Sequence, residues 1–358
     1  MSQKIGVLTS GGDCPGLNAV IRGVVRAATN RNWEVYGFHD GFEGLLPPAN
    51  YEVLNLKRCA GIMQLGGTIL GTTNRGHFVA KVGEGAHARI PDDVIAQAKE
   101  TFHGLGLTAL IAIGGDGSLS TALQLQEAGI PMIGVPKTID NDLEATAMTF
   151  GFDSAVACVT DALDRLHTTA SSHKRVMVIE VMGRHAGWIA LYGGLAGGAD
   201  IILIPEISFD YEKIAEAVRQ RAAEGCTSTL VVVAEGAHTQ DRGEVYRKSG
   251  AGEYKLGGIG EHVAAEISAR TGRETRCCVL GHLQRGGAPT SLDRILGTRF
   301  GVHAVELIAE GRFGEMVSYQ NYQVLSVPIS HAVHRTKRVP GDSQMVATCR
   351  SVGISFGD

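Results

Sequence analysis

Short apolar runs alternate with glycine-containing turns and amphipathic segments along most of the chain. We predict strands in the apolar runs at residues 5–9, 35–38, 109–113, 130–135, 176–181, 201–204 and 230–234. Apolar residues recur at helical spacing over residues 17–29 and about 119–128, which predicts a helix after two of these strands. This alternation is typical of an α/β protein with mostly parallel sheets and helices on both faces. The second half repeats the pattern of the first, which favours two similar α/β layers.

Two regions depart from this pattern. Residues 237–257 are polar and glycine-rich, and we expect them to form an exposed excursion. From about residue 311 to the end the chain is only weakly patterned, so we predict no elements there.

Length and composition set the broad class of the protein. A chain of 358 residues suggests about two domains. A hydrophobic content of 44% with 20% charged residues is typical of a soluble globular protein with a sizeable core. The net charge of −4 gives no support to nucleic-acid binding, although a local basic site for an anionic metabolite remains possible.

Cysteine usage and the N-terminal sequence indicate a compartment. The seven cysteines include no C-x-x-C pair, and this odd number without a disulfide framework is typical of a reducing cytosol. No signal segment precedes the first predicted strand, and no apolar run is long enough to span a membrane. We therefore expect a cytoplasmic protein without a membrane partner.

A cluster of polar residues follows the predicted strand at residues 130–135. Lys137, Thr138, Asp140 and Asp142 come within six residues, where an open α/β sheet places its chemistry. If the backbone stays extended, the two carboxylates face the same way. The cluster then suggests proton abstraction next to a phosphate. The alternative is a polar loop whose Asp and Asn residues cap the next helix.

Two glycine-rich loops follow strands and precede helices. The loop at residues 11–16 offers backbone N–H groups and a helix dipole to a phosphate, although many α/β proteins have an ordinary glycine turn here. The loop at residues 114–118 adds the carboxylate of Asp116, which could hold Mg²⁺ beside a polyphosphate or could cap the following helix. Neither loop matches the dinucleotide fingerprint or the P-loop.

Basic residues near strand ends form the third element. Arginine binds two phosphate oxygens at once. Arg175 and Arg184 flank the predicted strand at residues 176–181, and three more basic residues lie together in residues 276–287: Arg276, His282 and Arg285. Each one taken singly reads as a surface or capping residue, but together they favour a phosphorylated sugar. His185 and His282 have no partner at zinc-like spacing, so we predict no zinc. A polyphosphate cradle, Mg²⁺, a base and cations together describe phosphoryl transfer.

Five motifs in this chain resemble, in the same order, those of the 6-phosphofructokinases. They occupy residues 11–23, 114–118, 136–142, 182–188 and 280–287, and the resemblance extends from about residue 5 to residue 299. It implies two Rossmann-like three-layer domains with the active site in the cleft between them. The donor-binding domain would comprise residues 1–151 and about 284–334, and the fructose 6-phosphate domain about 152–283 and 335–358. It also implies Mg²⁺-dependent phosphorylation of the 1-hydroxyl of fructose 6-phosphate in glycolysis.

The resemblance assigns a role to each matching residue. Asp140 would be the base, supported by Thr138 and Asp142, and Asp116 would hold Mg²⁺. The donor phosphates would be bound by Gly12, Gly115, Asp116, Gly117 and Ser118. The sugar phosphate would be bound by Thr138, Ile139, Asp140, Met182, Gly183, Arg184, Glu235, His282, Leu283, Gln284 and Arg285. Arg175 and Arg276 would reach it from a neighbouring subunit, which requires at least a dimer, and a tetramer is common in the family.

The phosphoryl donor depends on two positions. In the family, pyrophosphate users carry an acid where this chain has Gly117 and a lysine where it has Lys137. A carboxylate at 117 would repel the α-phosphate of ATP. The combination of Gly117 and Lys137 resembles the mixed-substrate subgroup of the family, many members of which use ATP. We therefore expect ATP as donor. The family often has arginine at Asn74, and Arg75 could take over its contact with the donor phosphates.

Three other functions share features with this sequence. A pyrophosphate-dependent phosphofructokinase is the alternative within the same chemistry. A non-catalytic regulatory subunit is disfavoured because Asp116, Asp140, Asp142 and Arg184 are all present. A nicotinamide dehydrogenase would need the fingerprint that both glycine loops lack.

Regulation departs from the family pattern. Arg22 and Arg26 match two cations of the pocket in which short bacterial members bind ADP or phosphoenolpyruvate. The other expected cations are replaced by Leu56, His167, Glu224 and Cys226. Fewer positive charges weaken the binding of a multiply charged effector, so we expect this switch to be absent or altered.

Overall fold

A computed structural model describes residues 2–78, 89–240, 246–248, 254–333 and 335–358. The chain divides into two compact units. The first unit is Met1–Ile139, Leu143–Ser154 and Arg285–Thr336, and the second is Asp140–Asp142, Ala155–Gln284 and Lys337–Asp358. The α/β class with two domains is therefore confirmed. The assignment of the donor to one domain and the sugar to the other stays a prediction, as does an active site in the cleft between them.

The first unit is built on a seven-stranded sheet of order β13-β12-β5-β4-β1-β2-β3. The pairs from β12 to β2 are parallel, and the two edge strands β3 and β13 pair antiparallel. The strands are β1 (Lys4–Thr9), β2 (Glu34–Phe38), β3 (Tyr51–Leu54), β4 (Ala109–Gly114), β5 (Met132–Pro136), β12 (Glu315–Gln320) and β13 (Gln323–Pro328). Strand β4 is buried along its whole length, which is why its sequence reads as a continuous apolar run.

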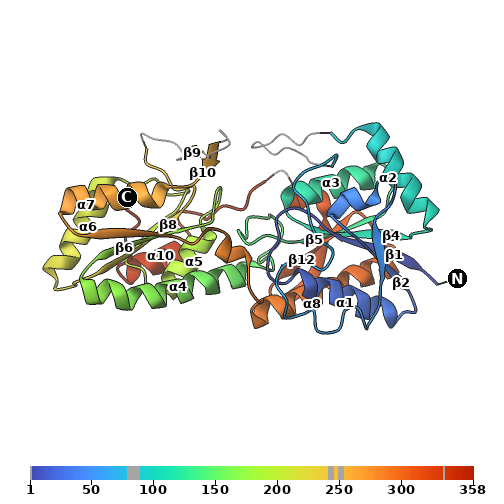
Figure 1. The fold of residues 1–358 in the computed structure, drawn as a ribbon, viewed down its shortest axis with the longest axis horizontal. Helices are drawn as coiled ribbons and strands as arrows, with labels where there is room; N and C mark the ends of the chain where they lie inside the picture. Colours follow the sequence, from blue (N-terminus) through green and yellow to red (C-terminus); the bar gives the residue numbers. More distant parts are fainter. Residues whose placement is uncertain (1, 79–88, 241–245, 249–253, 334) are drawn as a thin grey trace. The chain divides into compact units, whose positions relative to one another are not determined.

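Helices cover both faces of this sheet. Helices α1 and α8 pack together on one face, and α2 and α3 lie on the other (Figure 1). Their bounds, with those of the short helical segments, are α1 (Leu17–Thr29), η1 (Gly41–Leu45), α2 (Asp92–Gly104), α3 (Asp116–Glu127), α8 (Ser291–Ala309) and α9 (Ile329–Ala332). Helix α3 begins three residues before the predicted start at residue 119, so its first turn contains Asp116.

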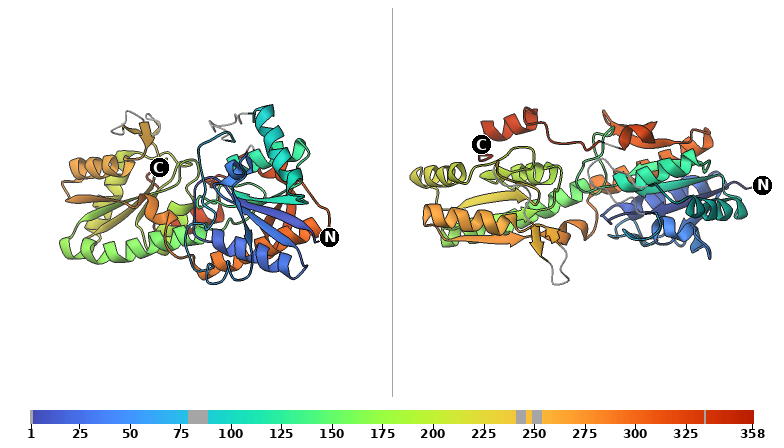
Figure 2. Two further views of the ribbon diagram at one scale, coloured as in Figure 1. Left: turned by 45° about the vertical axis from the view of Figure 1, so that its right-hand side comes forward. Right: turned by 90° about the horizontal axis from the view of Figure 1, so that it is seen from above.

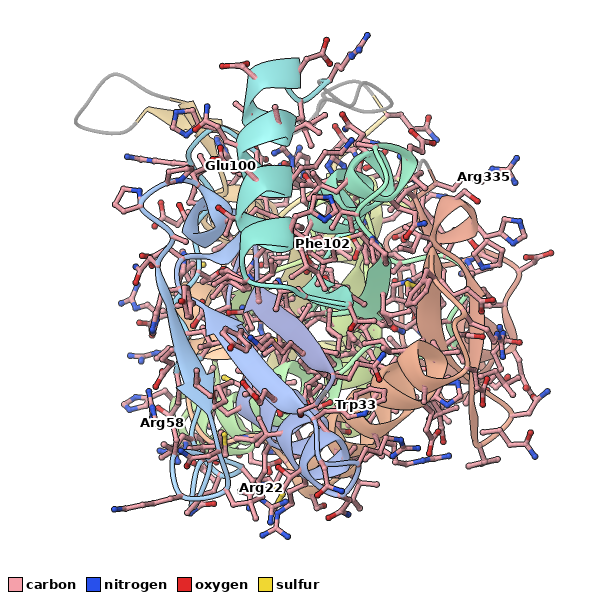
Figure 3. The ribbon with its side chains drawn as sticks, turned by 90° about the vertical axis from the view of Figure 1, so that its right-hand side faces the viewer. Arg22, Trp33, Arg58, Glu100, Phe102 and Arg335 are labelled. Atoms are coloured by element: carbon pink, nitrogen blue, oxygen red, sulfur yellow. The ribbon has the colours of Figure 1, made fainter. Side chains whose placement is uncertain are left out.

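Helix α2 was not predicted from the sequence. It buries Val94, Ala98 and Phe102, four residues apart, and it has two acidic residues in its first turn. Figure 3 shows Phe102 directed into the unit and Glu100 on the outer side of the same helix. The signal was therefore present in the periodicity, on a stretch that is otherwise polar.

The second unit contains a smaller sheet of four parallel strands in the order β11-β6-β8-β7. Helices α4 and α5 lie on one face and α6 and α7 on the other (Figures 1 and 2). The strands are β6 (Val176–Val181), β7 (Ile201–Leu203), β8 (Thr229–Ala234) and β11 (Thr275–Val279). The helical segments are α4 (Phe152–His173), α5 (Trp188–Ala196), α6 (Tyr211–Ala223), α7 (Ile259–Thr271), η2 (Gly281–Arg285) and α10 (Gln344–Ser351).

The two regions without a clear pattern have different outcomes. The stretch after residue 311 contains β12, β13, α9 and α10, none of which was predicted. The expected excursion at residues 237–257 includes the antiparallel strands β9 (Tyr246–Lys248) and β10 (Tyr254–Leu256). Its exposure is wrong at the start, because Ala237 is fully buried. Residues 241–245 and 249–253 lie outside the described residues.

Of the helices in the described ranges, none combines the length and the apolar character that crossing a membrane requires.

Candidate active site

The carboxyl ends of three neighbouring parallel strands meet in the first unit. The backbone N–H of Ser10, after β1, donates to Ile113 O in β4 at 2.9 Å. The N–H of Lys137, after β5, donates to Gly114 O at 2.9 Å. Both glycine-rich loops and the start of the 136–142 segment are thereby brought to one edge of the sheet. Open α/β sheets bind ligands at this edge.

A cavity of about 300 Å³ opens at this edge. Lys137 and Arg75 line it together with residues of the two glycine loops: Gly11, Gly12, Gly115, Asp116, Gly117 and Ser118. Their binding of the donor phosphates stays a prediction. Two core aromatic rings border the cavity: Phe42 and Phe78 are buried and lie 5.6 Å apart between ring centroids. Neither ring was foreseen from the sequence. A site with loop amides and cations can accept a phosphate chain.

Two cations hold the first glycine loop. The Lys137 ammonium is buried and donates to Gly12 O. The Arg285 guanidinium donates to Asp13 O at 3.2 Å, and a Cβ added to Gly12 would lie 2.6 Å from Arg285 Nη1. A side chain at position 12 would therefore displace the end of the Arg285 side chain from the loop. Arg285 belongs to the first unit and contacts its glycine loop, and its role as a sugar ligand stays a prediction.

Asp116 carries a carboxylate oxygen that is spare for a cation. The N-cap of α3 is Gly115, no side chain caps that helix end, and Asp116 is its first residue. The helix-capping interpretation of Asp116 is therefore wrong. Its Oδ1 is buried and has no hydrogen-bond partner among the described residues. A buried acceptor without a donor fits a hard cation such as Mg²⁺, which takes few protein oxygens and completes its shell with phosphate oxygens and water.

The described part of the chain contains no cluster of three or more His, Cys, Asp or Glu residues that could hold a metal ion. A cation at Asp116 would therefore have to share its coordination with the donor phosphates.

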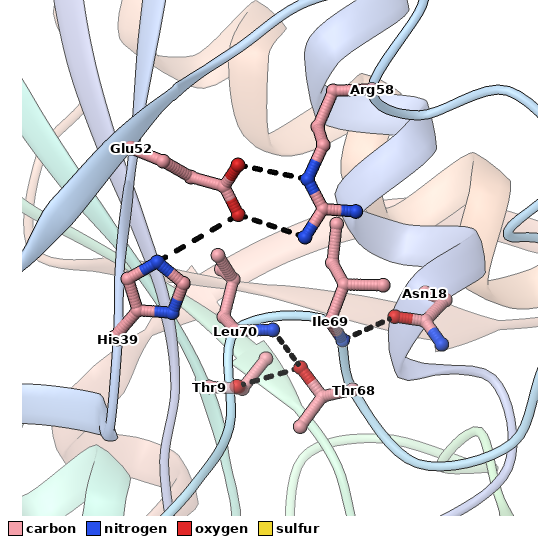
Figure 4. Close-up of polar contacts among 8 residues, drawn as sticks. All are labelled: Thr9, Asn18, His39, Glu52, Arg58, Thr68, Ile69 and Leu70. Atoms are coloured by element: carbon pink, nitrogen blue, oxygen red, sulfur yellow. Dashed lines mark hydrogen bonds and ion pairs between the residues drawn. The ribbon is translucent and has the colours of Figure 1, made fainter.

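The loop at residues 71–75 is held in place behind the cavity. Thr9 Oγ1 lies 3.0 Å from Thr68 Oγ1 and donates to Gly71 O at 2.7 Å. Asn18 Oδ1 accepts from the backbone N–H of Ile69 at 2.9 Å (Figure 4). Helix α1 and strand β1 thus fix the loop that brings Asn74 and Arg75 to the cavity. The Arg75 side chain itself is exposed.

In the second unit, two strand ends approach each other closely. Gly236 N, after β8, donates to Gly183 O, after β6, at 3.1 Å. A Cβ at position 236 would lie 1.9 Å from Arg184 O, a contact no side chain can make. Position 236 therefore requires glycine. The close approach of the two strand ends brings Glu235 and the exposed Arg184 to the same edge of the sheet.

The side chain of Gln284 is buried and engaged in hydrogen bonds within the second unit. Its side chain is 1% exposed, and its amide accepts from Met182 N at 3.2 Å and donates to Gly281 O at 3.0 Å. It therefore joins the loop after β11 to the end of β6. His282 and Leu283 on the same loop are exposed, whereas Ile139 in the first unit is fully buried.

Arg175 and Arg276 share one acid that sequence reasoning missed. Glu274 Oε2 lies 2.9 Å from Arg175 Nε, and its Oε1 lies 2.7 Å from Arg276 Nη2. The close contact with the Arg175 guanidinium lowers the pKa of Glu274 below its usual value, so the carboxylate stays charged between the two guanidinium groups. The acid orients both arginines before any ligand arrives.

The turn at residues 140–142 is not extended. Asn141 has φ +52°, in the left-handed region that asparagine tolerates better than most residues. The expectation that Asp140 and Asp142 face the same way through an extended backbone is therefore wrong. The capping alternative fails as well, because the next helix, α4, begins only at Phe152.

One α/β unit has a cavity lined by glycine loops and a spare carboxylate, and the other has arginines at its strand ends. Together these features define a phosphate-handling enzyme of Rossmann-like architecture. The chain belongs to the phosphofructokinase family, whose sequence model matches residues 4–308. The resemblance drawn from the five motifs is thereby confirmed.

Similar proteins include both donor types. The chain is 52% identical to the ATP-dependent 6-phosphofructokinase of Chloroflexus aggregans, over 99% of this chain and 98% of the relative. It is 47% identical to the pyrophosphate–fructose 6-phosphate 1-phosphotransferase of Streptomyces coelicolor, over 99% of this chain and 100% of the relative. A crystal structure of Pichia pastoris phosphofructokinase in the T-state superposes with a TM-score of 0.82 at 29% identity, covering 99% of this chain and 37% of the Pichia chain.

Proposed function

We propose that this protein is an ATP-dependent 6-phosphofructokinase, which transfers the γ-phosphoryl group of ATP to the 1-hydroxyl of fructose 6-phosphate in glycolysis. Full-length similarity to a relative of that name supports the reaction. The observation that carries the proposal is the cavity of the first unit, where two glycine loops meet the spare carboxylate of Asp116. We propose the cytoplasm as its location, supported by seven cysteines of which none is in a disulfide.

The choice of ATP over pyrophosphate rests on Gly117. This residue lies in the first turn of α3 and lines the cavity without a side chain. An acid there would repel the α-phosphate that ATP has and pyrophosphate lacks. Pyrophosphate remains the second candidate, because a relative of comparable identity is named for it.

The proposed reaction transfers one proton and exchanges one bond to phosphorus for another. Asp140 takes the proton of the sugar 1-hydroxyl while the oxygen of that hydroxyl attacks the γ-phosphorus of ATP. The bond from that phosphorus to the β–γ bridging oxygen breaks, and ADP leaves with the electron pair. Thr138 and Asp142 support the base, and Lys137 and Arg184 offset the negative charge that spreads over the transferred group.

Asp116 is the residue we assign to Mg²⁺, since its buried Oδ1 lacks a donor. The ion supplies charge neutralisation for the donor phosphates when bound. The glycine loops bind the phosphates through backbone N–H groups. Because glycine has no side chain, the phosphate oxygens stay accessible to the cation.

We propose a homo-oligomer, a dimer at least and a tetramer by family resemblance. Arg175 and Arg276 would complete the sugar-phosphate site of a neighbouring copy. Their shared acid Glu274 supports this role, because it holds two exposed or half-exposed arginines side by side instead of letting them disperse.

A coupled assay of fructose 6-phosphate with ATP, and then with pyrophosphate, tests the proposal. We expect Mg²⁺-dependent formation of fructose 1,6-bisphosphate with ATP and little with pyrophosphate. Turnover of pyrophosphate with no use of ATP would overturn the donor. Turnover of neither would overturn the reaction.

A further inference from the structure

The C-terminal segment that follows β13 and α9 contacts the turn that carries the proposed base. Lys337 Nζ donates to Asn141 Oδ1 at 3.1 Å, and the backbone N–H of Lys337 donates to Asp142 O at 2.8 Å. All three residues belong to the second unit. One residue therefore holds the turn through both its side chain and its backbone.

The held residue is the one with the unusual backbone. Asn141 is 4% exposed and has φ +52°, so its conformation has to be stabilised by its surroundings. Its buried side-chain oxygen is satisfied by the Lys337 ammonium through a charge-assisted hydrogen bond. Asp140 immediately precedes Asn141, so the φ of Asn141 and the contacts of its side chain fix the direction in which the chain leaves Asp140.

Lys337 is in turn fixed by the motif at residues 182–188. The indole N–H of Trp188 donates to Lys337 O at 2.8 Å, and the Lys337 ammonium lies 5.8 Å from the centre of the Trp188 ring. Two residues further on, Val339 N donates to Glu206 Oε1 at 2.8 Å, and the same carboxylate accepts from Gly187 N at 3.0 Å. The C-terminal segment thus joins the catalytic turn to the loop that carries Arg184.

We propose that Lys337 is a positioning residue for phosphoryl transfer. Through its contact with Asn141 it fixes the orientation of Asp140, and through its contacts with Trp188 it fixes the position of the 140–142 turn relative to the 182–188 loop. The inference rests on the proposed function, because it takes Asp140 as the base. It also gives the C-terminal segment, for which the sequence predicted no element, a role in catalysis. Lys337 itself contacts neither substrate in this account.

The test compares Lys337→Met with Lys337→Arg in the full-length enzyme. Methionine keeps the apolar stem over Trp188 and removes the donor, whereas arginine retains a donor for Asn141. We expect Lys337→Met to lower kcat by about ten- to a hundredfold, the loss typical of a displaced catalytic group, with both KM values changed less than about threefold. Lys337→Arg should recover most of the rate.

Two further variants separate positioning from general destabilisation. Arg335→Met removes a cation two residues earlier, on an exposed side chain that projects away from the protein (Figure 3), and should keep the wild-type rate. Asn141→Gly keeps access to positive φ but removes the side-chain acceptor. Because Lys337 acts through that acceptor, Lys337→Met should change kcat by less than about twofold in the Asn141→Gly background.

The outcomes separate the two claims. Wild-type kcat in Lys337→Met would overturn the positioning role while leaving the proposed function intact. A loss of rate of the same size in the Asn141→Gly background would also overturn it. A wild-type enzyme inactive towards fructose 6-phosphate would instead contradict the proposed function. If Lys337→Met does not fold, the comparison of Lys337→Arg with Asn141→Gly decides, since only the second should lose rate.

Discussion

Replacing Gly236 by alanine would place a methyl group where the backbone of Arg184 now lies. The added Cβ would be 1.9 Å from Arg184 O, whereas real Cβ atoms stay beyond 3.0 Å, so one strand end has to move by about 1 Å. A shift of that size at a positioned group costs about a hundredfold in rate, which corresponds to about 2.7 kcal/mol of transition-state stabilisation. Overpacking adds a loss of stability of about 1–3 kcal/mol.

Steady-state kinetics with fructose 6-phosphate and ATP measures this effect. We expect Gly236→Ala to lower kcat/KM for the sugar about a hundredfold and to leave the KM for ATP nearly unchanged, because the donor cavity lies in the first unit. Gly341→Ala is the matched control, since its added Cβ meets nothing within 4 Å. Wild-type kcat/KM in Gly236→Ala would refute the reasoning that this contact fixes Arg184.

Four further predictions follow from individual residues. Asp116→Asn should lower kcat at least about a hundredfold and raise the Mg²⁺ concentration for half-maximal rate, measured by metal titration; an unchanged titration would exclude Asp116 as ligand. Gly117→Asp should raise the KM for ATP about ten- to a hundredfold through charge repulsion, and an unaltered KM would contradict the donor argument. Phosphoenolpyruvate should inhibit weakly, and strong inhibition that disappears in Arg22→Ala would overturn the altered switch. Burial raises the pKa of Asp293 from 3.8 to about 6, so the folded protein holds this proton more tightly than the unfolded chain. The free energy of unfolding of the wild type, relative to that of Asp293→Asn, should therefore fall by about 3 kcal/mol as the pH rises from about 4 to 6. Denaturant unfolding measures this difference, and a difference that does not change with pH would contradict the reasoning.

The strands of the sheet centres were predictable because both of their faces are buried. Strand β4 reads as an uninterrupted apolar run for this reason, and its predicted range differs from the observed one by a single residue. Helix α2 was missed although its buried residues recur every fourth position, because its polar residues dominate the composition. Strands β12 and β13 have half-exposed or exposed positions, so no continuous apolar run marks them.

The glycine loops and Asp116 were predictable because their chemistry is local. Each loop directly follows a strand, so its place at the sheet edge follows from the sequence. Glu274 and Lys337 could not be found in this way. Glu274 reaches Arg175 only because β11 pairs with β6, and Lys337 meets Asn141 across almost 200 positions of the chain. Contacts of this kind depend on the tertiary fold and leave no periodic signal.

The backbone of residues 140–142 differs most from the sequence prediction. An extended 140–142 segment would have been consistent with the alternation of a strand, but the positive φ of Asn141 turns the chain between the two acids. Asparagine tolerates this conformation without requiring it, so the sequence permits both arrangements.

The kinetics of Asp140→Asn test the central claim most directly, because this substitution removes the base and keeps the size and shape of the side chain. The account predicts that kcat falls by at least about a thousandfold while the KM values for fructose 6-phosphate and ATP change little, since a base acts on the barrier and not on binding. A variant that retains a rate near that of the wild type would contradict the assignment of Asp140 and with it the proposed course of phosphoryl transfer.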